Sequence, residues 1–173
     1  EIFKTNDIIL PSQKKLRLTL REEYYIDKVC HKKDFDIMEQ VVLEKYPEYN
    51  SSILEIFNGN KIHHFNMFIM KRHDFDKYML WLFDVLFECE KRIDTSIYSP
   101  VESRALAFLA ERLFTLYVHH NKFNKYELTV GYINPQHRIF KFLKTNNNKI
   151  IESVYYLLYI LDKYFKIKKK DGQ

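Results

Sequence analysis

A short apolar and aromatic run, K-I-H-H-F-N-M-F-I-M-K-R at residues 61–72, lies between stretches with the charge pattern of amphipathic helices. Because the run is short and has polar ends, it predicts a buried β-strand between helices. Polar groups on a buried strand need hydrogen-bond partners, and a ligand can be one of them. His63, His64 and Asn66 are therefore candidate functional residues, or else polar groups that are satisfied inside the fold.

On a β-strand, these three residues would lie on two opposite faces. Successive side chains on a strand point to opposite faces, so we expect His64 and Asn66 on one face and His63 on the other. The pair on one face suits either a polyhydroxylated ligand or the fixing of a turn. The sequence leaves both readings open.

Helical patterns dominate the rest of the chain, in which 3 Gly and 4 Pro among 173 residues give few interruptions. Strong amphipathic periodicity predicts helices at 74–92 and 99–119. Short strands are expected at 7–11 and 127–133. Strands at intervals among dominant helices indicate a helix-rich α/β architecture. Further helices are expected at 16–29, 49–57, 149–166 and 34–46, the last with Asp34 as its N-cap.

The charge balance limits the classes of partner. Lys and Arg number 28 against 23 acidic residues, a net charge of +5, and the excess lies in the tail after residue 162. Such a tail is either a solvent-exposed end of the chain or a segment that contacts an anionic membrane surface. No interleaved aromatic and basic motif is present, so we expect no nucleic-acid partner. Cys30 and Cys89 have no metal-type spacing and indicate reduced thiols of a cytosolic protein.

Two further groups of residues are candidates for chemistry. Glu102 and Arg104, with Asp94, surround the start of the predicted helix 99–119, where exposed N–H groups favour an anion or a sugar hydroxyl. Glu102 also stands three residues after Ser99, the spacing of a capping box, so it can simply cap the helix. Glu111 and Arg112, inside an apolar stripe, suit a structural ion pair.

Several segments together resemble a known family. They are D-I-I-L-P, E-K-Y-P-E-Y, H-H-F-N-M-F-I-M-K, W-L-F-D-V-L-F-E-C-E-K-R-I-D, and Y-S-P followed by R-A-L-A-F-L-A-E-R-L, all within residues 5–133. They look like the C-terminal two-thirds of a bacterial family of capsular polysaccharide and lipopolysaccharide glycosyltransferases, formerly described as a domain of unknown function. Family members usually have Gln where this chain has Glu102 and Ser where it has Ala110.

The resemblance implies a GT-A-like α/β fold that uses a nucleotide-sugar donor and a lipid-linked glycan acceptor at the cytoplasmic face of the membrane. In this hypothesis His64 and Asn66 bind sugar hydroxyls, the catalytic Glu102 orients or deprotonates a hydroxyl, and Arg104 offsets diphosphate charge. A divalent metal, Mn or Mg, is expected if the nucleotide-binding half supplies acidic ligands. The basic tail would allow peripheral membrane contact.

The family's N-terminal nucleotide-binding half is not found in residues 1–173. We therefore expect residues 1–133 to be the C-terminal part of a glycosyltransferase domain, and 134–173 to be a polar loop and a C-terminal helix with a basic tail. If the polypeptide starts at Glu1, little activity is expected. The alternative function is a truncated, non-catalytic module that binds a glycan or a protein.

Overall fold

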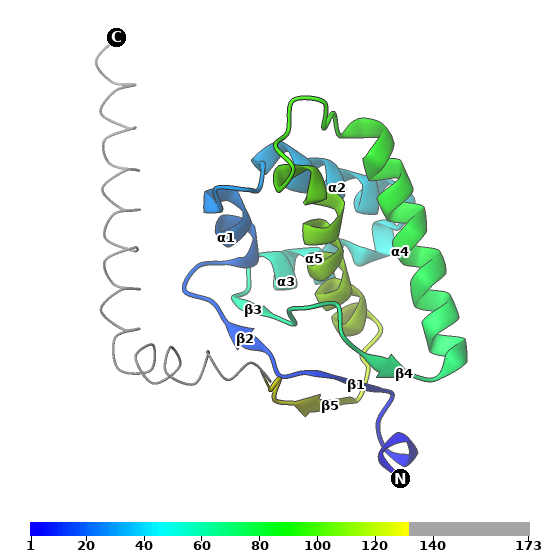
Figure 1. Ribbon diagram of the computed structural model, residues 1–173. Coiled ribbons are helices and arrows are strands. Elements are labelled where there is room, and N and C mark those ends of the chain that lie inside the picture. Colours follow the sequence, from blue (N-terminus) through cyan, green and yellow to red (C-terminus); the bar gives the residue numbers. More distant parts are fainter. Residues whose placement is uncertain (132–173) are drawn as a thin grey trace, which may run out of the picture. The chain divides into compact units, whose positions relative to one another are not determined.

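The computed structural model describes residues 1–131 (Figure 1). The chain divides into two units, Glu1–Val130 and Gly131–Gln173, and the first unit holds all the elements discussed below. The predicted polar loop at 134–148, the helix at 149–166 and the basic tail lie outside the described residues, as does the end of the strand predicted at 127–133. The boundary at residue 133 stays a prediction.

Helices make up most of the first unit, as the sequence indicated. The strongest patterns give α4, Arg72–Arg92, and α5, Ala105–His120, the latter preceded by a short 3-10 helix at Glu102–Arg104. Every helix within residues 1–131 is too short or too polar to cross a membrane. The other helices are α1 (Leu20–Ile26), α2 (Lys32–Lys45) and α3 (Asn50–Phe57), with 3-10 turns at Ile2–Lys4 and Pro47–Tyr49.

Two small sheets complete the fold. In the larger sheet β1, Ile8–Pro11, lies between β4, Ile69–Met70, which is antiparallel to it, and β5, Lys125–Leu128, which is parallel. Ile8 and Leu10 on β1 are buried in the core, whereas Ile69 and Tyr126, which flank Ile9 in the register, are exposed. Helices in the described chain therefore cover one face of this sheet. The second sheet pairs β2 (Lys14–Lys15) with β3 (Lys61–Ile62) in antiparallel fashion.

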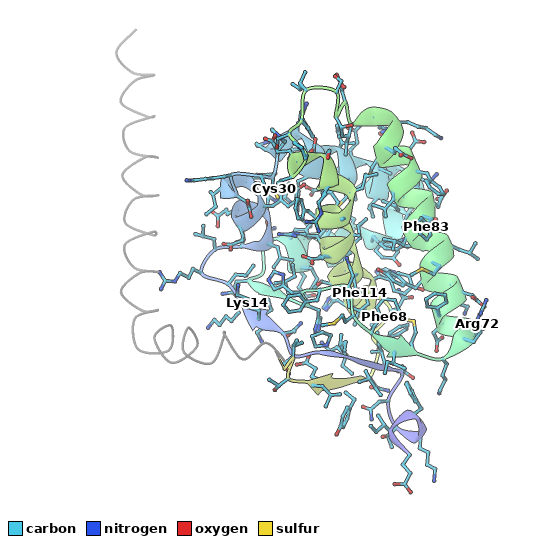
Figure 2. The ribbon with its side chains drawn as sticks, in the orientation of Figure 1. Lys14, Cys30, Phe68, Arg72, Phe83 and Phe114 are labelled. Carbon is cyan, nitrogen blue, oxygen red and sulfur yellow. The ribbon has the colours of Figure 1, made fainter. Side chains whose placement is uncertain are left out.

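Helix α5 forms the centre of the core. It packs against α2, α3 and α4 and runs through the middle of the helical layer in Figure 1. Ten of its residues are buried, including Arg112 and Thr115. Phe114 on α5 stacks on Phe68 with 5.1 Å between ring centroids, and Figure 2 shows the two rings next to each other. Burying rings of this size supplies much of the stabilising apolar area of a core.

The single strand predicted at 61–72 is wrong. The run contains two short strands in different sheets, β3 and β4, and a loop between them, and Arg72 already belongs to α4. Phe65 and Asn66 have φ angles of 82° and 45°, which a strand does not allow. Because the pleat is broken there, the expected common face for His64 and Asn66 does not exist.

Two helix starts also differ from the expectation. Asp34 lies inside the first turn of α2, fully buried, and His31 precedes the helix as its N-cap residue. Helix α1 begins at Leu20 and not at residue 16, because Thr19 and Glu22 form a capping box that fixes its first turn. Apolar periodicity locates a helix but does not identify its first residue. The first residue depends on capping hydrogen bonds such as these.

Candidate functional site

The loop between β3 and β4, residues 63–68, is attached to the core by His63. This side chain is 1% exposed. Its backbone N–H donates to Thr115 Oγ1 on α5 (3.1 Å), and its Nδ1–H donates to the carbonyl of Pro11 on β1 (2.8 Å). Burial lowers the pKa of His63, with the Pro11 bond opposing it, which favours the neutral ring. His63 is thus a structural residue that joins the loop to α5 and the sheet.

The tip of the loop is held by a carboxylate from the middle of α5. Glu111 Oε1 accepts the backbone N–H of Phe65 at 3.2 Å. This bond stabilises the left-handed conformation of Phe65, which is uncommon for a residue with a Cβ. The side chains of Phe65, Asn66 and Met67 are exposed. The fold therefore presents an aromatic ring and an amide on a fixed loop.

Glu111 also contacts His64. His64 Nδ1 lies 3.5 Å from Glu111 Oε2, and its Nε2 is buried without a hydrogen-bond partner among the described residues. The His64 side chain as a whole is 25% exposed. A carboxylate on one ring nitrogen orients an imidazole and leaves the other nitrogen free for a ligand. We call His64, Phe65, Asn66 and Glu111 the loop junction.

The charge of Glu111 is balanced by Arg112. Arg112 Nη1 donates to Glu111 Oε2 (3.3 Å) and to the Phe108 carbonyl (3.0 Å), and its guanidinium carbon lies 5.1 Å from the centroid of the Tyr24 ring. Burial raises the pKa of Glu111, but His64, Arg112 and the N–H of Phe65 together outweigh it and hold this pKa below its usual value. The predicted Glu111–Arg112 ion pair is confirmed, and Glu111 remains a carboxylate.

Glu102 lies in a different environment, at the start of the helical segment. Its Oε2 accepts the backbone N–H of Ser99 (2.7 Å), and the N–H of Glu102 donates to Ser99 Oγ (3.4 Å), so the predicted capping box is present. Its Oε1 lies 3.1 Å from His31 Nε2. The bonds from Ser99, with a smaller contribution from His31, lower the pKa of Glu102. Both of its oxygens therefore have structural partners.

The residues around Glu102 form one connected group. The Tyr98 ring stacks on His31 with 4.2 Å between centroids, and its hydroxyl donates to Asp34 Oδ1 at 2.8 Å. Asp34 is fully buried, its Oδ2 has no partner among the described residues, and burial raises its pKa. We call His31, Asp34, Tyr98, Ser99 and Glu102 the cap cluster.

The structure does not bring the four predicted site residues together. His64 and Asn66 are in the loop junction, which meets the middle of α5 at Glu111, whereas Glu102 and Arg104 are at the start of the helical segment. At 1.5 Å per residue, Glu102 lies about 13 Å along the chain axis from Glu111. Arg104 is exposed, and its guanidinium carbon lies 5.5 Å from the Phe108 ring centroid. One substrate hydroxyl cannot meet both groups.

The described residues do not fit the predicted divalent metal. Within residues 1–131, His, Cys, Asp and Glu side chains form no group of three that could hold an ion. The sequence hypothesis assigned the metal ligands to a nucleotide-binding half that residues 1–173 do not include. Manganese or magnesium therefore stays a prediction.

Sequence reasoning missed Phe65 and the link from Glu111 to the loop. Phe65 looked like a core residue because it stands in an apolar run, and only the left-handed backbone turns it outward. Glu111 and Phe65 are 46 positions apart, and nothing in either segment marks their contact. The one local signal was a Glu beside an Arg in an apolar helix, which demands a polar partner nearby.

Comparisons with known proteins agree with the sequence resemblance in outline. A family model described as Domain of unknown function (DUF4422) matches residues 1–122. No curated protein matches the chain. Among solved structures, the chain is similar to the apo structure of WbbM, a bifunctional glycosyltransferase, with 26% identity and a TM-score of 0.69. The match covers 75% of this chain and 26% of WbbM, so the chain spans about a quarter of that protein.

Proposed function

We propose a sugar-transfer function for this chain, which belongs to the family described as Domain of unknown function (DUF4422). The likeness to a bifunctional glycosyltransferase, at a TM-score of 0.69 over 75% of the chain, carries the proposal. The likeness supports the class of reaction, and the loop junction supports a place for a sugar. We infer that the donor is a nucleotide sugar and the acceptor a glycan.

In this proposal the loop junction binds sugar hydroxyls. His64 Nε2 is buried and unpartnered in the described residues, and the Asn66 side chain, two positions along the same loop, is exposed. An imidazole and an amide supply both donors and acceptors, which suits a hydroxyl that can do either. Glu111 is the positioning residue, because it contacts His64 Nδ1 and fixes the backbone of Phe65. Transfer forms a bond from an acceptor hydroxyl to the donor's anomeric carbon and releases the nucleotide.

The finer parts of the proposal rest on the sequence resemblance. They are a GT-A-like fold, a lipid-linked acceptor in capsule or lipopolysaccharide synthesis at the cytoplasmic face of the membrane, and a Mn or Mg cofactor. The catalytic role of Glu102 and the diphosphate role of Arg104 also stay predictions. The bonds of Glu102 to Ser99 and His31 favour a capping role for it instead.

A thermal-shift screen tests the donor. The protein is heated with UDP-, GDP- and dTDP-sugars, each with and without manganese, and a ligand that binds the folded state raises the midpoint with concentration. We expect one nucleotide class to do so, and the same donor to release its nucleotide in a turnover assay with the full natural polypeptide. Glycan binding with no nucleotide effect and no turnover in that polypeptide would instead support the non-catalytic alternative.

A further inference from the structure

Phe65 is the outermost point of a loop whose two ends are fixed in the core. His63 is bonded to β1 and α5 at one end, and Phe68 stacks on Phe114 at the other. Between these anchors, Phe65 has φ 82° and Asn66 has φ 45°. Two consecutive left-handed residues that are not Gly store strain in the backbone, and such strain concentrates at ligand-binding positions. The strain here keeps an aromatic ring out of the core.

The Phe65 ring is open to solvent on a backbone that is held in place. It is 48% exposed, and the neighbouring Met67 is 44% exposed. Its backbone N–H is held by Glu111, and the His64 ring lies against it with 5.8 Å between centroids and a 51° tilt. A loop backbone that is already held in place loses little conformational entropy when a ligand packs on a ring that it carries.

We propose that the Phe65 ring is the platform on which the acceptor sugar stacks, and this inference rests on the proposed sugar-transfer function. The face of an aromatic ring is electron-rich, and the C–H bonds on the less polar face of a pyranose carry partial positive charge, so the two faces attract. The adjacent Asn66 amide then reaches the hydroxyls at the sugar's rim. An aromatic face with a few convergent polar groups is the usual composition of a small-ligand site.

The charges beneath the loop favour a neutral sugar over the nucleotide. A donor carries a diphosphate, which needs accessible cations. Arg112, below the loop, is 7% exposed and already pairs with Glu111. Because Glu111 and Arg112 offset each other, neither is a free charge beneath the loop that could hold a diphosphate. The platform therefore takes the uncharged acceptor, while the donor binds elsewhere.

Saturation-transfer NMR tests the platform. The probes are the methyl α- and β-pyranosides of galactose, glucose and mannose, and saturation is applied to the protein's aromatic protons. We expect at least one glycoside to receive saturation at its ring C–H protons with the natural protein. Phe65→Ala should weaken that binding at least tenfold, whereas Phe65→Tyr, which keeps the ring, should retain it. Phe83→Ala on α4 is the matched control, because Phe83 is 45% exposed on another element (Figure 2).

Each outcome decides the inference. Glycoside binding that survives Phe65→Ala, or that Phe83→Ala reduces equally, overturns the platform, and so does an absence of binding by the natural protein. Thermal midpoints of all variants show whether they fold; if Phe65→Ala does not, Phe65→Ser with Phe65→Tyr replaces it. The nucleotide-sugar thermal shift is measured on the same variants. If it persists in Phe65→Ala while glycoside binding is unaffected, the platform fails and the proposed function stands; if no nucleotide sugar shifts the natural protein, the donor proposal itself fails.

Discussion

At the start of the α5 segment, His31 and Glu102 form one histidine–carboxylate pair, and in the middle of α5 His64 and Glu111 form another. In the cap cluster, one oxygen of Glu102 accepts the Ser99 N–H and the other contacts His31. The atom without a partner there is Asp34 Oδ2, whose side chain is fully buried. In the loop junction the unpartnered atom is His64 Nε2, on a side chain that is 25% exposed. The same pair of residue types therefore belongs to a set of capping bonds in one place, and in the other it leaves a buried imidazole nitrogen unpaired at the base of an exposed loop.

The largest effect that this comparison predicts is on stability, in the cap cluster. Tyr98→Phe removes the hydroxyl that donates to the buried Asp34 carboxyl, and an unpaired buried charged group costs about 3 kcal/mol. Urea unfolding should show that loss as a lower free energy of unfolding. Tyr126→Phe, on the exposed strand β5, is the control and should change little. A loss for Tyr98→Phe no greater than the control's would mean that the cap cluster is not structural.

The next effect is on activity, in the loop junction. His64→Ala removes a proposed hydrogen bond to a sugar hydroxyl, which is worth about 1–3 kcal/mol and corresponds to a fall in turnover of about 5- to 150-fold. The thermal midpoint should stay close to that of the natural protein, because the contact of His64 with Glu111 at 3.5 Å is long and its Nε2 has no hydrogen bond to lose among the described residues. His119→Ala is the control, since His119 forms a similar pair with Glu55 at 3.0 Å on another surface. Equal turnover in both variants would remove His64 from the site.

A smaller effect separates the two regions directly. Glu102→Gln keeps an oxygen for the Ser99 N–H but loses the charge that faces His31, so we expect a slight fall in the thermal midpoint and no change in turnover. The reverse result, full stability with a marked loss of turnover, would restore the catalytic role that the sequence suggested. The cap cluster would then belong to the functional site, and it would no longer differ in role from the loop junction.

The sequence predicted the elements that depend on periodic burial. α4 and α5 follow from apolar spacing, and Leu82, Leu86 and Leu109 are buried as expected, whereas Phe83 and Phe87 of the same apolar pattern are exposed. Pairing of Glu111 with Arg112 also follows from local pattern. Both cysteines suggested buried thiols by the same pattern, but Cys89 is buried and Cys30 only partly so. Periodicity records which side of an element faces the core, so it succeeds wherever that side is regular.

The candidate site was predicted only in part, because it depends on backbone torsion and long-range contact. The H-H-F-N motif pointed to the correct loop, but an apolar run contains no signal for the left-handed turn at Phe65 and Asn66. Alternation of side chains along a strand could not apply there. The distance between Glu102 and His64 was beyond the sequence for a related reason, since chain order alone does not measure the length of helix between Glu102 and Glu111.

The smallest predicted effect is on the pH dependence of stability. On acidification, one carboxyl in each region changes its contribution to the free energy of unfolding, and the two changes have opposite signs. The pKa of Glu111 lies below its usual 4.5, so its stabilising contribution is present above pH 4.5 and is lost as the pH falls through the lowered value. The pKa of Asp34 lies above its usual 3.8 because of burial, so its contribution is greatest below pH 3.8 and is lost as the pH rises through the raised value.

Two amide variants separate these opposing contributions. Unfolding free energies between pH 3 and 7 should fall less steeply on the acid side for Glu111→Gln than for the natural protein. Asp34→Asn still accepts the Tyr98 hydroxyl and carries no buried charge, so its stability at pH 7 should be equal or higher, and its decline toward acid should be steeper. If both variants changed the slope in the same direction, the two carboxyls would share one kind of environment. The distinction between a buried structural acid and a paired site carboxylate would then be lost.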